Sequence, residues 1–447
     1  MIVIGECVTC DLERTYTMKL GPVNRLFEPI ECCWKEHLVK PIEHCLTLEL
    51  AKIYRSLLRV AGKVCFIAVT GSCGKTTTTE LIAAILSKEG QIQKQSIANT
   101  IDYIAKAILT VRPWHRFCVN EVSGHQPGVI AKSAKLLRPQ IGVLTHIGQD
   151  HYSSYRSLEL TAAEKARLVE ALPAGGVAVL NTDDPYVYAM RQRTRARVIT
   201  YGLSPDAMVR GESVSCAWPR PMSLDVCYTQ KRLHVQTRLL GEHWAYAVLA
   251  ALSAAVAAGV SLERAVQAIE AFNPLPGRMS PHQTPNGVTF IRDDCKAPLW
   301  TIPASLGFMR TAKAKRKVVV IGSVSDTPKS FYHRYLTVIK LALDVADKII
   351  FVGDHARSAL TARPCLKDDR VMVFDTLYQL NSFLGNYLET GDLVLLKGSE
   401  ITDHLERIVL SRTNDIACWQ ERCGKQRFCS DCRNRHSPFV PVSAPQF

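Results

Sequence analysis

The chain has 447 residues, of which 47% are hydrophobic and 21% are charged. This length predicts two or three domains with an ample apolar core. The longest apolar run, residues 245–260, is mostly alanine and too short to span a bilayer, so it is interpreted as a buried helix. The first residues carry no basic region before an apolar stretch, which argues against a signal peptide. We expect a cytoplasmic protein and no membrane partner.

The formal net charge of +14 indicates an anionic partner: nucleic acid, an acidic lipid surface or a phosphorylated substrate. Charge alone does not choose among them, and nothing beyond charge favours nucleic acid. The basic cluster at 310–317 precedes an apolar run and is expected to form a solvated surface turn. Sixteen cysteines lie mainly in apolar segments. There they behave as small hydrophobes, and without an export signal we expect reduced thiols.

The first sixty residues predict one helix, at 46–60. From 61 to about 280, apolar strands alternate with helical patterns, which favours a mainly parallel sheet. The predicted strands are 64–69, 117–122, 141–145, 177–180 and 197–201. Hairpin-like segments follow at 208–240, and helices at 243–258 and 261–272.

A Gly-rich turn follows the first of these strands and opens an amphipathic helix. Such a turn directs successive backbone N–H groups at one point beside the positive end of the helix dipole, which fits a triphosphate. Lys75 would reach the β- and γ-phosphates and the Thr76 hydroxyl would bind Mg²⁺. Val69 replaces the first glycine of the usual Walker motif. The predicted nucleotide-binding residues of the loop are Gly71, Ser72, Cys73, Gly74, Lys75, Thr76 and Thr77.

A second α/β unit is predicted at 288–412. Four short apolar runs, at 318–321, 348–352, 371–374 and 393–396, each end in a turn, with helical spacing between them. The pattern is Rossmann-like, without a dinucleotide fingerprint. The predicted fold class is therefore α/β: a central P-loop ATPase-like domain with a parallel sheet, followed by a Rossmann-like α/β domain.

The short loop followed by Thr76 to Thr79 resembles the ATP site of the Mur ligase family. These enzymes join an amino acid or peptide to a carboxylate during peptidoglycan synthesis, and folylpolyglutamate and cyanophycin synthetases are their relatives. The resemblance runs from about 61 to 412. It implies an ATP- and Mg²⁺-dependent ligase that forms an amide bond through an acyl phosphate, using a small-molecule or peptide carboxylate and an amine or amino acid.

Glu121 leaves a predicted buried strand beside the phosphate loop, where it is well placed to bind Mg²⁺ or is an ordinary strand-end carboxylate. The resemblance also implies a Mg²⁺ ligand at this position. It implies further that His151 binds metal and that Lys165, fourteen residues later, is a carbamate bridging a second Mg²⁺. The predicted metal ligands are thus Thr76, Glu121, His151 and Lys165, and the predicted catalytic residues are Lys75, Lys165, His151 and Lys296.

Elements near the junction of the two domains complete the resemblance. They imply that Arg278 approaches the phosphates, Asp294 binds the ATP ribose and Lys296 neutralises the transferring phosphate. Asp184, in an Asn-x-Asp-Asp element, has either a capping or a catalytic role. At 241–247, two asparagines of the family element are replaced by Trp244 and Ala247. Either Trp244 stacks on the base, or adenine is held less specifically, or this copy is degenerate.

Residues 1–60 are too few for the UDP-sugar-binding domain that peptidoglycan ligases usually carry, which puts a UDP-muramoyl substrate in doubt. The alternative to a ligase is a non-catalytic or regulatory nucleotide-binding paralogue. The predicted organisation is a short N-terminal segment (1–60), a central ATP-binding domain (61–280), a C-terminal α/β domain (281–412) and a basic, Cys-rich tail (413–447).

The tail contains four cysteines, and only the last pair, Cys429 and Cys432, has the spacing of a metal knuckle. The four cysteines either form a structural zinc site or are free thiols on a loose tail. Cys7 and Cys10 offer an alternative partner pair for Cys429 and Cys432. A protein partner for the tail is a further possibility. The predicted zinc ligands are Cys418, Cys423, Cys429 and Cys432.

Overall fold

The computed structural model describes residues 40–61, 64–150, 152–362, 368–413, 415–421, 423–425 and 427–437. The chain divides into two compact units, 1–50 and 51–447. Helix α2 (Lys40–Ala61) crosses that boundary. The second unit contains every site residue predicted from the sequence except Cys7 and Cys10. Those two cysteines and His151 lie outside the described residues.

A nine-stranded sheet forms the core of the central region, in the order β2-β3-β1-β4-β5-β6-β7-β8-β9. All pairs from β2 to β7 are parallel, and β7, β8 and β9 are antiparallel. The parallel sheet and the hairpins were both predicted. The strands are β1 Cys65–Thr70, β2 Ile92–Gln95, β3 Phe117–Glu121, β4 Ile141–Leu144, β5 Val177–Asn181, β6 Arg197–Gly202, β7 Val209–Ala217, β8 Arg220–Tyr228 and β9 Lys231–Gln236.

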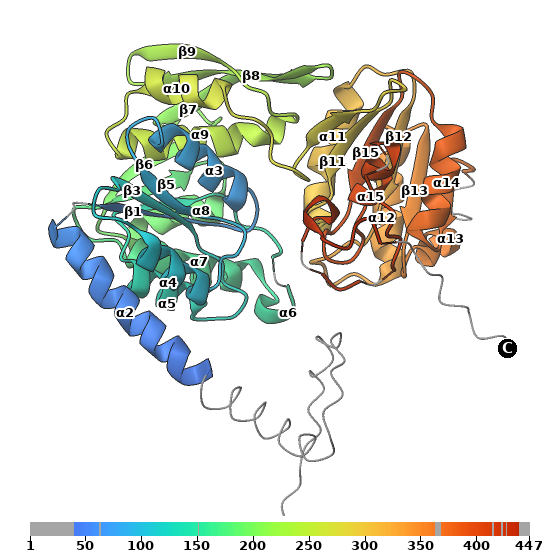
Figure 1. Ribbon diagram of the computed structural model, residues 1–447. Coiled ribbons are helices and arrows are strands. Elements are labelled where there is room, and N and C mark those ends of the chain that lie inside the picture. Colours follow the sequence, from blue (N-terminus) through green and yellow to red (C-terminus); the bar gives the residue numbers. More distant parts are fainter. Residues whose placement is uncertain are drawn as a thin grey trace, which may run out of the picture. The chain divides into compact units, whose positions relative to one another are not determined.

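Helices cover both faces of this sheet (Figure 1): α3, α9 and α10 lie on one side, and α4, α5 and α7 on the other. Helix α9 is the alanine-rich run, and its small buried side chains let it pack closely against α3, β5 and β6. The apolar run therefore belongs to the core. The helices are α3 Lys75–Leu86, α4 Ile101–Thr110, α5 Val129–Leu137, α6 Tyr152–Tyr155, α7 Leu158–Glu170, α8 Pro185–Ala189, α9 Ala245–Ala257 and α10 Leu262–Glu270.

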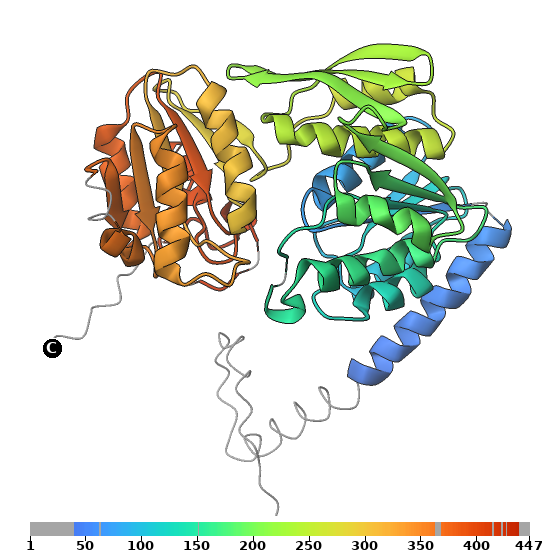
Figure 2. The same ribbon diagram turned by 180° about the vertical axis from the view of Figure 1, so that it is seen from behind.

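The C-terminal region contains a six-stranded sheet in the order β10-β11-β15-β12-β13-β14. Only the β10–β11 pair is antiparallel. The four predicted strands are β12 to β15, and Figure 2 shows α11 and α12 packed beside them. The elements are β10 Ser280–Gln283, β11 Thr289–Asp293, α11 Ile302–Thr311, β12 Lys317–Ile321, α12 Phe331–Leu343, β13 Lys348–Val352, α13 Arg357–Ala362, β14 Val371–Phe374, α14 Leu377–Tyr387, β15 Leu393–Lys397 and α15 Glu406–Leu410.

The described part of the tail is packed against this domain. Ile416, Trp419 and Cys429 are buried in the same apolar cluster as Leu405 and Ile408. The alternative of a loose tail is therefore wrong for the described residues of 415–437, because apolar side chains anchor the segment at both ends.

Ion pairs at the surface and the character of the helices complete the description of the fold. Two residues of the basic cluster at 310–317 pair with acidic groups: Lys315 with Glu389, and Arg316 with Asp392. None of the helices in the described ranges combines the length and the apolar character that a membrane crossing requires.

Candidate active site

The phosphate loop is shaped by two glycines. Gly74 caps the N-terminus of α3 with φ +74°, a left-handed conformation that glycine adopts without strain. A Cβ on Gly71 would lie only 1.9 Å from Oγ1 of Thr145, on the neighbouring strand end. The Thr145 hydroxyl in turn donates to the carbonyl oxygen of Cys73 at 2.6 Å. Both glycines are thus required by the geometry, and the loop is held against the end of β4.

Lys75 lies at the start of α3 and is 9% exposed. Its Nζ donates to the carbonyl of Gly71 at 2.9 Å and lies 3.7 Å from Oδ2 of Asp150. The buried Thr77 hydroxyl has no hydrogen-bond partner among the described residues. An orphaned hydroxyl and an ammonium group at a helix N-terminus fit a bound phosphate, because both supply donors to an anion.

Thr76 and Glu121 come together beside the loop. The Thr76 hydroxyl donates to Oε2 of Glu121 at 2.8 Å, and the amide of Asn99 donates to Oε1 at 2.8 Å. Glu121 is 2% exposed. Burial alone would raise the pKa of this carboxyl, but the positive charges of Lys75 and Arg278 and the bond from Thr76 lower it overall. A charged carboxylate and a hydroxyl oxygen are the ligands that Mg²⁺ prefers, so this pair fits the metal.

Lys165 lies on α7 and is 1% exposed. Its Nζ is 3.4 Å from Oδ2 of Asp150, the carboxylate that Lys75 also faces. Burial, together with the charge of Lys75, lowers the pKa of Lys165 to about 8, although Asp150 opposes the shift. The structure thus joins Lys75 and Lys165 through Asp150.

Sequence reasoning assigned no role to two residues of this site, Asp150 and Asn99. Asp150 stands next to His151, a predicted metal ligand, so its place in the sequence could have drawn attention to it. Asn99 follows a short polar edge strand, β2, which carries no strong sequence signal. Its contact with Glu121 could not have been found from local pattern.

Arg278 reaches the same cluster from the turn after α10. Its Nη2 donates to the Thr76 hydroxyl at 3.0 Å, although 202 positions separate the two residues. Gly277 has φ +69°, which lets the turn fold tightly before Arg278. The structure therefore brings Arg278 to the hydroxyl of Thr76, the residue that follows Lys75 in the phosphate loop.

Asp294 and Lys296 follow β11. Asp294 is buried and accepts bonds from Nε of Arg292 at 3.2 and 3.3 Å, and Arg292 also pairs with Glu406 at 2.7 Å. Burial raises the pKa of Asp294 to about 6, and Arg292 limits the rise. Lys296 is exposed. Within the described part of the chain, neither residue makes a hydrogen bond or an ion pair with the residues of the phosphate loop.

Asp184 and Trp244, whose roles the sequence left open, have structural roles. Asp184 caps α8 by accepting from the N–H of Val187 at 3.0 Å, and it also accepts from the N–H of Ile147 at 2.7 Å. Trp244 is 8% exposed and lies in the main apolar cluster. A buried indole has little free ring face, so the packing disfavours stacking of Trp244 on a base.

Comparison with known proteins decides the family. The model of the Mur ligase middle domain matches residues 69–255, and that of the Mur ligase glutamate ligase domain matches 277–400. The chain is 30% identical over 401 residues to the UDP-N-acetylmuramoyl-tripeptide–D-alanyl-D-alanine ligase of Mycobacterium tuberculosis (strain CDC 1551 / Oshkosh), which covers 82% of this chain and 76% of the relative. The chain belongs to the Mur ligase family. It is an ATP-dependent carboxylate–amine ligase, and the non-catalytic alternative is not supported.

Other relatives agree with this assignment. The ligase of the same name from Mycobacterium leprae is 27% identical over 385 residues, covering 78% of this chain and 74% of the relative. A crystal structure of MurF from Acinetobacter baumannii superposes with a TM-score of 0.75 at 23% identity, over 83% of this chain and 80% of that one. MurF from Thermotoga maritima, solved with ADP, gives 0.72 at 19% identity, over 83% and 84%. These structures support the fold.

Proposed function

We propose that the Mur ligase reaction of this chain takes place at the cluster of Lys75, Thr76, Glu121, Lys165 and Arg278. The observation that carries the proposal is the contact of Thr76 with both Glu121 and Arg278 at the mouth of the phosphate loop. It brings a metal-binding carboxylate and a phosphate-binding guanidinium to one hydroxyl.

The reaction has two steps. A substrate carboxylate oxygen attacks the γ-phosphorus of ATP, the bond to the β-phosphate oxygen breaks, and ADP and an acyl phosphate result. The amine nitrogen then attacks the acyl carbon, the C–N bond forms, phosphate leaves and the nitrogen loses a proton. Lys75 and Arg278 stabilise the negative charge on the phosphates and hold them in line. Thr76 and Glu121 would hold Mg²⁺, which supplies Lewis-acid stabilisation of phosphate charge.

Lys165 is proposed to act as a carbamate. Only a neutral amine attacks CO₂, and a pKa of about 8 leaves roughly a tenth of the side chain neutral at pH 7. The carbamate would be an anionic oxygen ligand for a second Mg²⁺. We propose that His151 contributes to the same metal site, Asp294 to ribose binding and Lys296 to neutralisation of the transferring phosphate.

The substrates are proposed at the level of class. The relatives are named for UDP-N-acetylmuramoyl peptides and an amino acid or dipeptide. We propose for this chain a peptide or small-molecule carboxylate and an amine or amino acid. The need for ATP supports a cytoplasmic location. The proposed domains are 1–60, 61–280, 281–412 and 413–447. For the tail we propose bound zinc and leave a protein partner as a prediction.

The test is phosphate release from ATP with a UDP-N-acetylmuramoyl tripeptide and D-alanyl-D-alanine as the first substrate pair, followed by other acids and amines. Release that depends on both substrates, and falls about 100-fold or more in Glu121→Gln, supports the proposal. Glu80→Gln, a carboxylate on α3 that pairs with Lys94, is the matched control. Full activity of Glu121→Gln would overturn the assignment of this site.

A further inference from the structure

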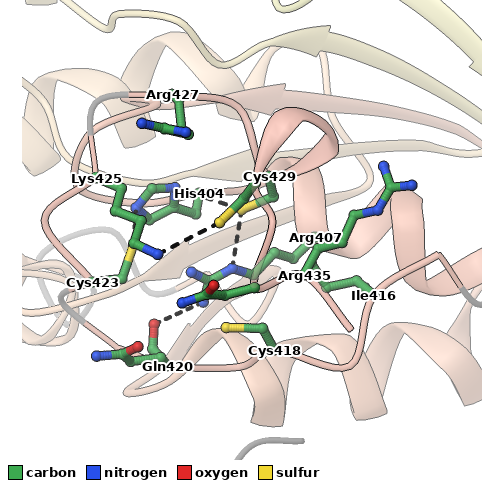
Figure 3. Close-up of a pocket in the computed structure, with 12 residues that line it drawn as sticks. His404, Arg407, Ile416, Cys418, Gln420, Cys423, Lys425, Arg427, Cys429 and Arg435 are labelled. Carbon is green, nitrogen blue, oxygen red and sulfur yellow. Dashed lines mark hydrogen bonds between the residues drawn. The ribbon is translucent and has the colours of Figure 1, made fainter. Parts of the chain in front are cut away.

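The tail forms a cavity that the ligase reaction does not use. It has a volume of about 20 Å³, enough for a single water-sized atom. Figure 3 shows it beside α15. Its lining includes the four tail cysteines, one imidazole and four basic side chains (Cys418, Cys423, Cys429, Cys432, His404, Arg407, Lys425, Arg427 and Arg435), together with Ile416, Gln420 and Asn434.

The imidazole comes from outside the tail. His404 lies just before α15, is 4% exposed, and its ring stands between two cysteines (Figure 3). Its Nε2 is 2.9 Å from Sγ of Cys423, and its Nδ1 is 3.7 Å from Sγ of Cys429. Cys432 follows Cys429 through a short 3₁₀ turn, in which its N–H donates to the carbonyl of Cys429 at 3.1 Å. This turn brings the Cys-x-x-Cys pair back to the same side of the chain.

Two cations face these sulfurs. Nε of Arg407 donates to Sγ of Cys429 at 3.3 Å, and Nζ of Lys425 donates to Sγ of Cys432 at 3.7 Å. Arg407 is 3% exposed and has no ion pair with an aspartate or glutamate of the described residues. A buried guanidinium needs a counter-charge. Thiolates would supply it, and bound metal is what keeps buried thiols deprotonated.

We propose that Cys423, Cys429, Cys432 and His404 bind one structural zinc ion. Three thiolates and a neutral imidazole form a closed tetrahedral set, with no position left for a catalytic water. Arg407 and Lys425 would balance the negative charge of the complex and orient two of the sulfurs. This assignment replaces the predicted Cys418 with His404. In the view of Figure 3, Cys418 lies on the other side of Arg407 from Cys429.

The four side chains are not yet closed around one point. In the ranges that the structure describes, no three His, Cys, Asp or Glu side chains have the arrangement of metal ligands. Binding therefore requires the sulfurs to rotate into the cavity, so metal binding would be coupled to a rearrangement of these side chains.

Zinc binding would also affect the neighbouring Phe428. Phe428 lies beside the proposed ligand Cys429, and its ring faces the guanidinium of Arg292 at 5.1 Å. A Cβ on Gly277 would lie 3.1 Å from the same ring. Zinc would thus fix the aromatic side chain that packs against the turn before Arg278.

The experiment measures zinc in the purified full-length chain by mass spectrometry and titrates it with a chelator of known zinc affinity. We expect about one zinc per chain in the wild type. Cys429→Ser should lose it, and His404→Gln should weaken binding by more than about 100-fold, the upper end of losses from outer-sphere changes. The matched controls are Cys418→Ser, in the same cavity, and Cys227→Ser on β8; both should keep the metal.

A second measurement covers variants that fail to fold. Co²⁺ added to the metal-free wild type should give the sulfur-to-cobalt charge-transfer band of thiolate coordination, with visible bands of tetrahedral geometry. Absence of zinc and of these bands, or a disulfide between tail cysteines in the isolated protein, would overturn the site. Zinc lost in Cys418→Ser but retained in His404→Gln would overturn the assignment of His404.

Discussion

The phosphate loop and the tail cavity both bury positive charge, but they give it different partners. At the loop, Arg278 donates to Thr76, Lys75 pairs with Asp150, and the charges of both cations act on the carboxylate of Glu121. In the tail, Arg407 faces sulfur. The phosphate loop has cations and the unpaired hydroxyl of Thr77, which suit an anion. The tail cavity has cysteine sulfurs and an imidazole, which suit a metal cation. The identity of the buried counter-charge thus indicates which kind of ligand each region binds.

The two regions also differ in how they are built. The loop is one continuous segment after a buried strand, so its glycines and Lys75 come together through local backbone geometry. The tail site draws on residues spread from 404 to 432 and depends on the packing of Trp419 and Cys429 against α15. Substitutions in the loop should therefore lower ATP turnover, whereas substitutions in the tail should first lower the free energy of unfolding. Four predictions test this comparison.

Lys75→Ala should lower ATP turnover about 1,000-fold or more, because it removes the ammonium group that stabilises phosphate charge. The free energy of unfolding should change little, since the lost contacts are bonds to loop carbonyls and a 3.7 Å ion pair with Asp150, which keeps Lys165 as its partner. A coupled assay of ADP release, with circular dichroism of the same samples, measures both. Lys88→Ala, just after the same helix, is the control. Wild-type turnover in Lys75→Ala would contradict the phosphate-loop assignment.

Trp419→Ala should lower the free energy of unfolding by about 3 kcal/mol, because it removes a buried ring from the C-terminal cluster. Urea denaturation followed by fluorescence measures the change. Trp114, whose side chain is 65% exposed, provides the control Trp114→Ala, which should be nearly neutral. Equal stability of the two variants would mean that the tail is not part of the folded domain.

Lys165→Ala should slow substrate-dependent phosphate release about 100-fold, or ~2.7 kcal/mol in activation free energy. Added bicarbonate should not restore activity, whereas a short carboxylic acid such as acetate should restore part of it by replacing the carbamate. The exposed Lys132 on α5 gives the control Lys132→Ala. Full activity of untreated Lys165→Ala would make Lys165 a structural residue.

The rate of carbamate formation at Lys165, which follows the fraction of neutral amine, should rise about tenfold between pH 6 and pH 7 at constant CO₂ pressure. Burial lowers the pKa to about 8, so the neutral amine appears at lower pH than in an ordinary lysine and its fraction levels off above pH 8. The ¹³C NMR signal of the carbamate, formed from ¹³CO₂, follows the reaction, and it should be absent in Lys165→Ala. A formation rate that goes on rising tenfold per pH unit above pH 8, as expected for an ordinary lysine, would disprove the shifted pKa.

The sequence by itself predicted the α/β class, five parallel strands of the central sheet and four of the C-terminal strands, because buried parallel strands are continuous apolar runs. It did not predict β2, β10 or β11, which are short or polar at their edges. It also predicted nucleotide- or metal-binding roles for Lys75, Thr76 and Glu121, since these stand at a strand-to-helix turn and at a strand end.

Only the tertiary structure decided which distant residues meet. Arg278 contacts Thr76 across 202 positions, Asp150 links Lys75 to Lys165, and Asn99 completes the shell of Glu121. His404 enters the cysteine cavity in the same way. Local patterns report the conformation of a segment, but contacts between segments depend on the packing of the whole domain. For this reason the sequence indicated a possible metal site in the tail but did not identify His404 as one of its proposed ligands.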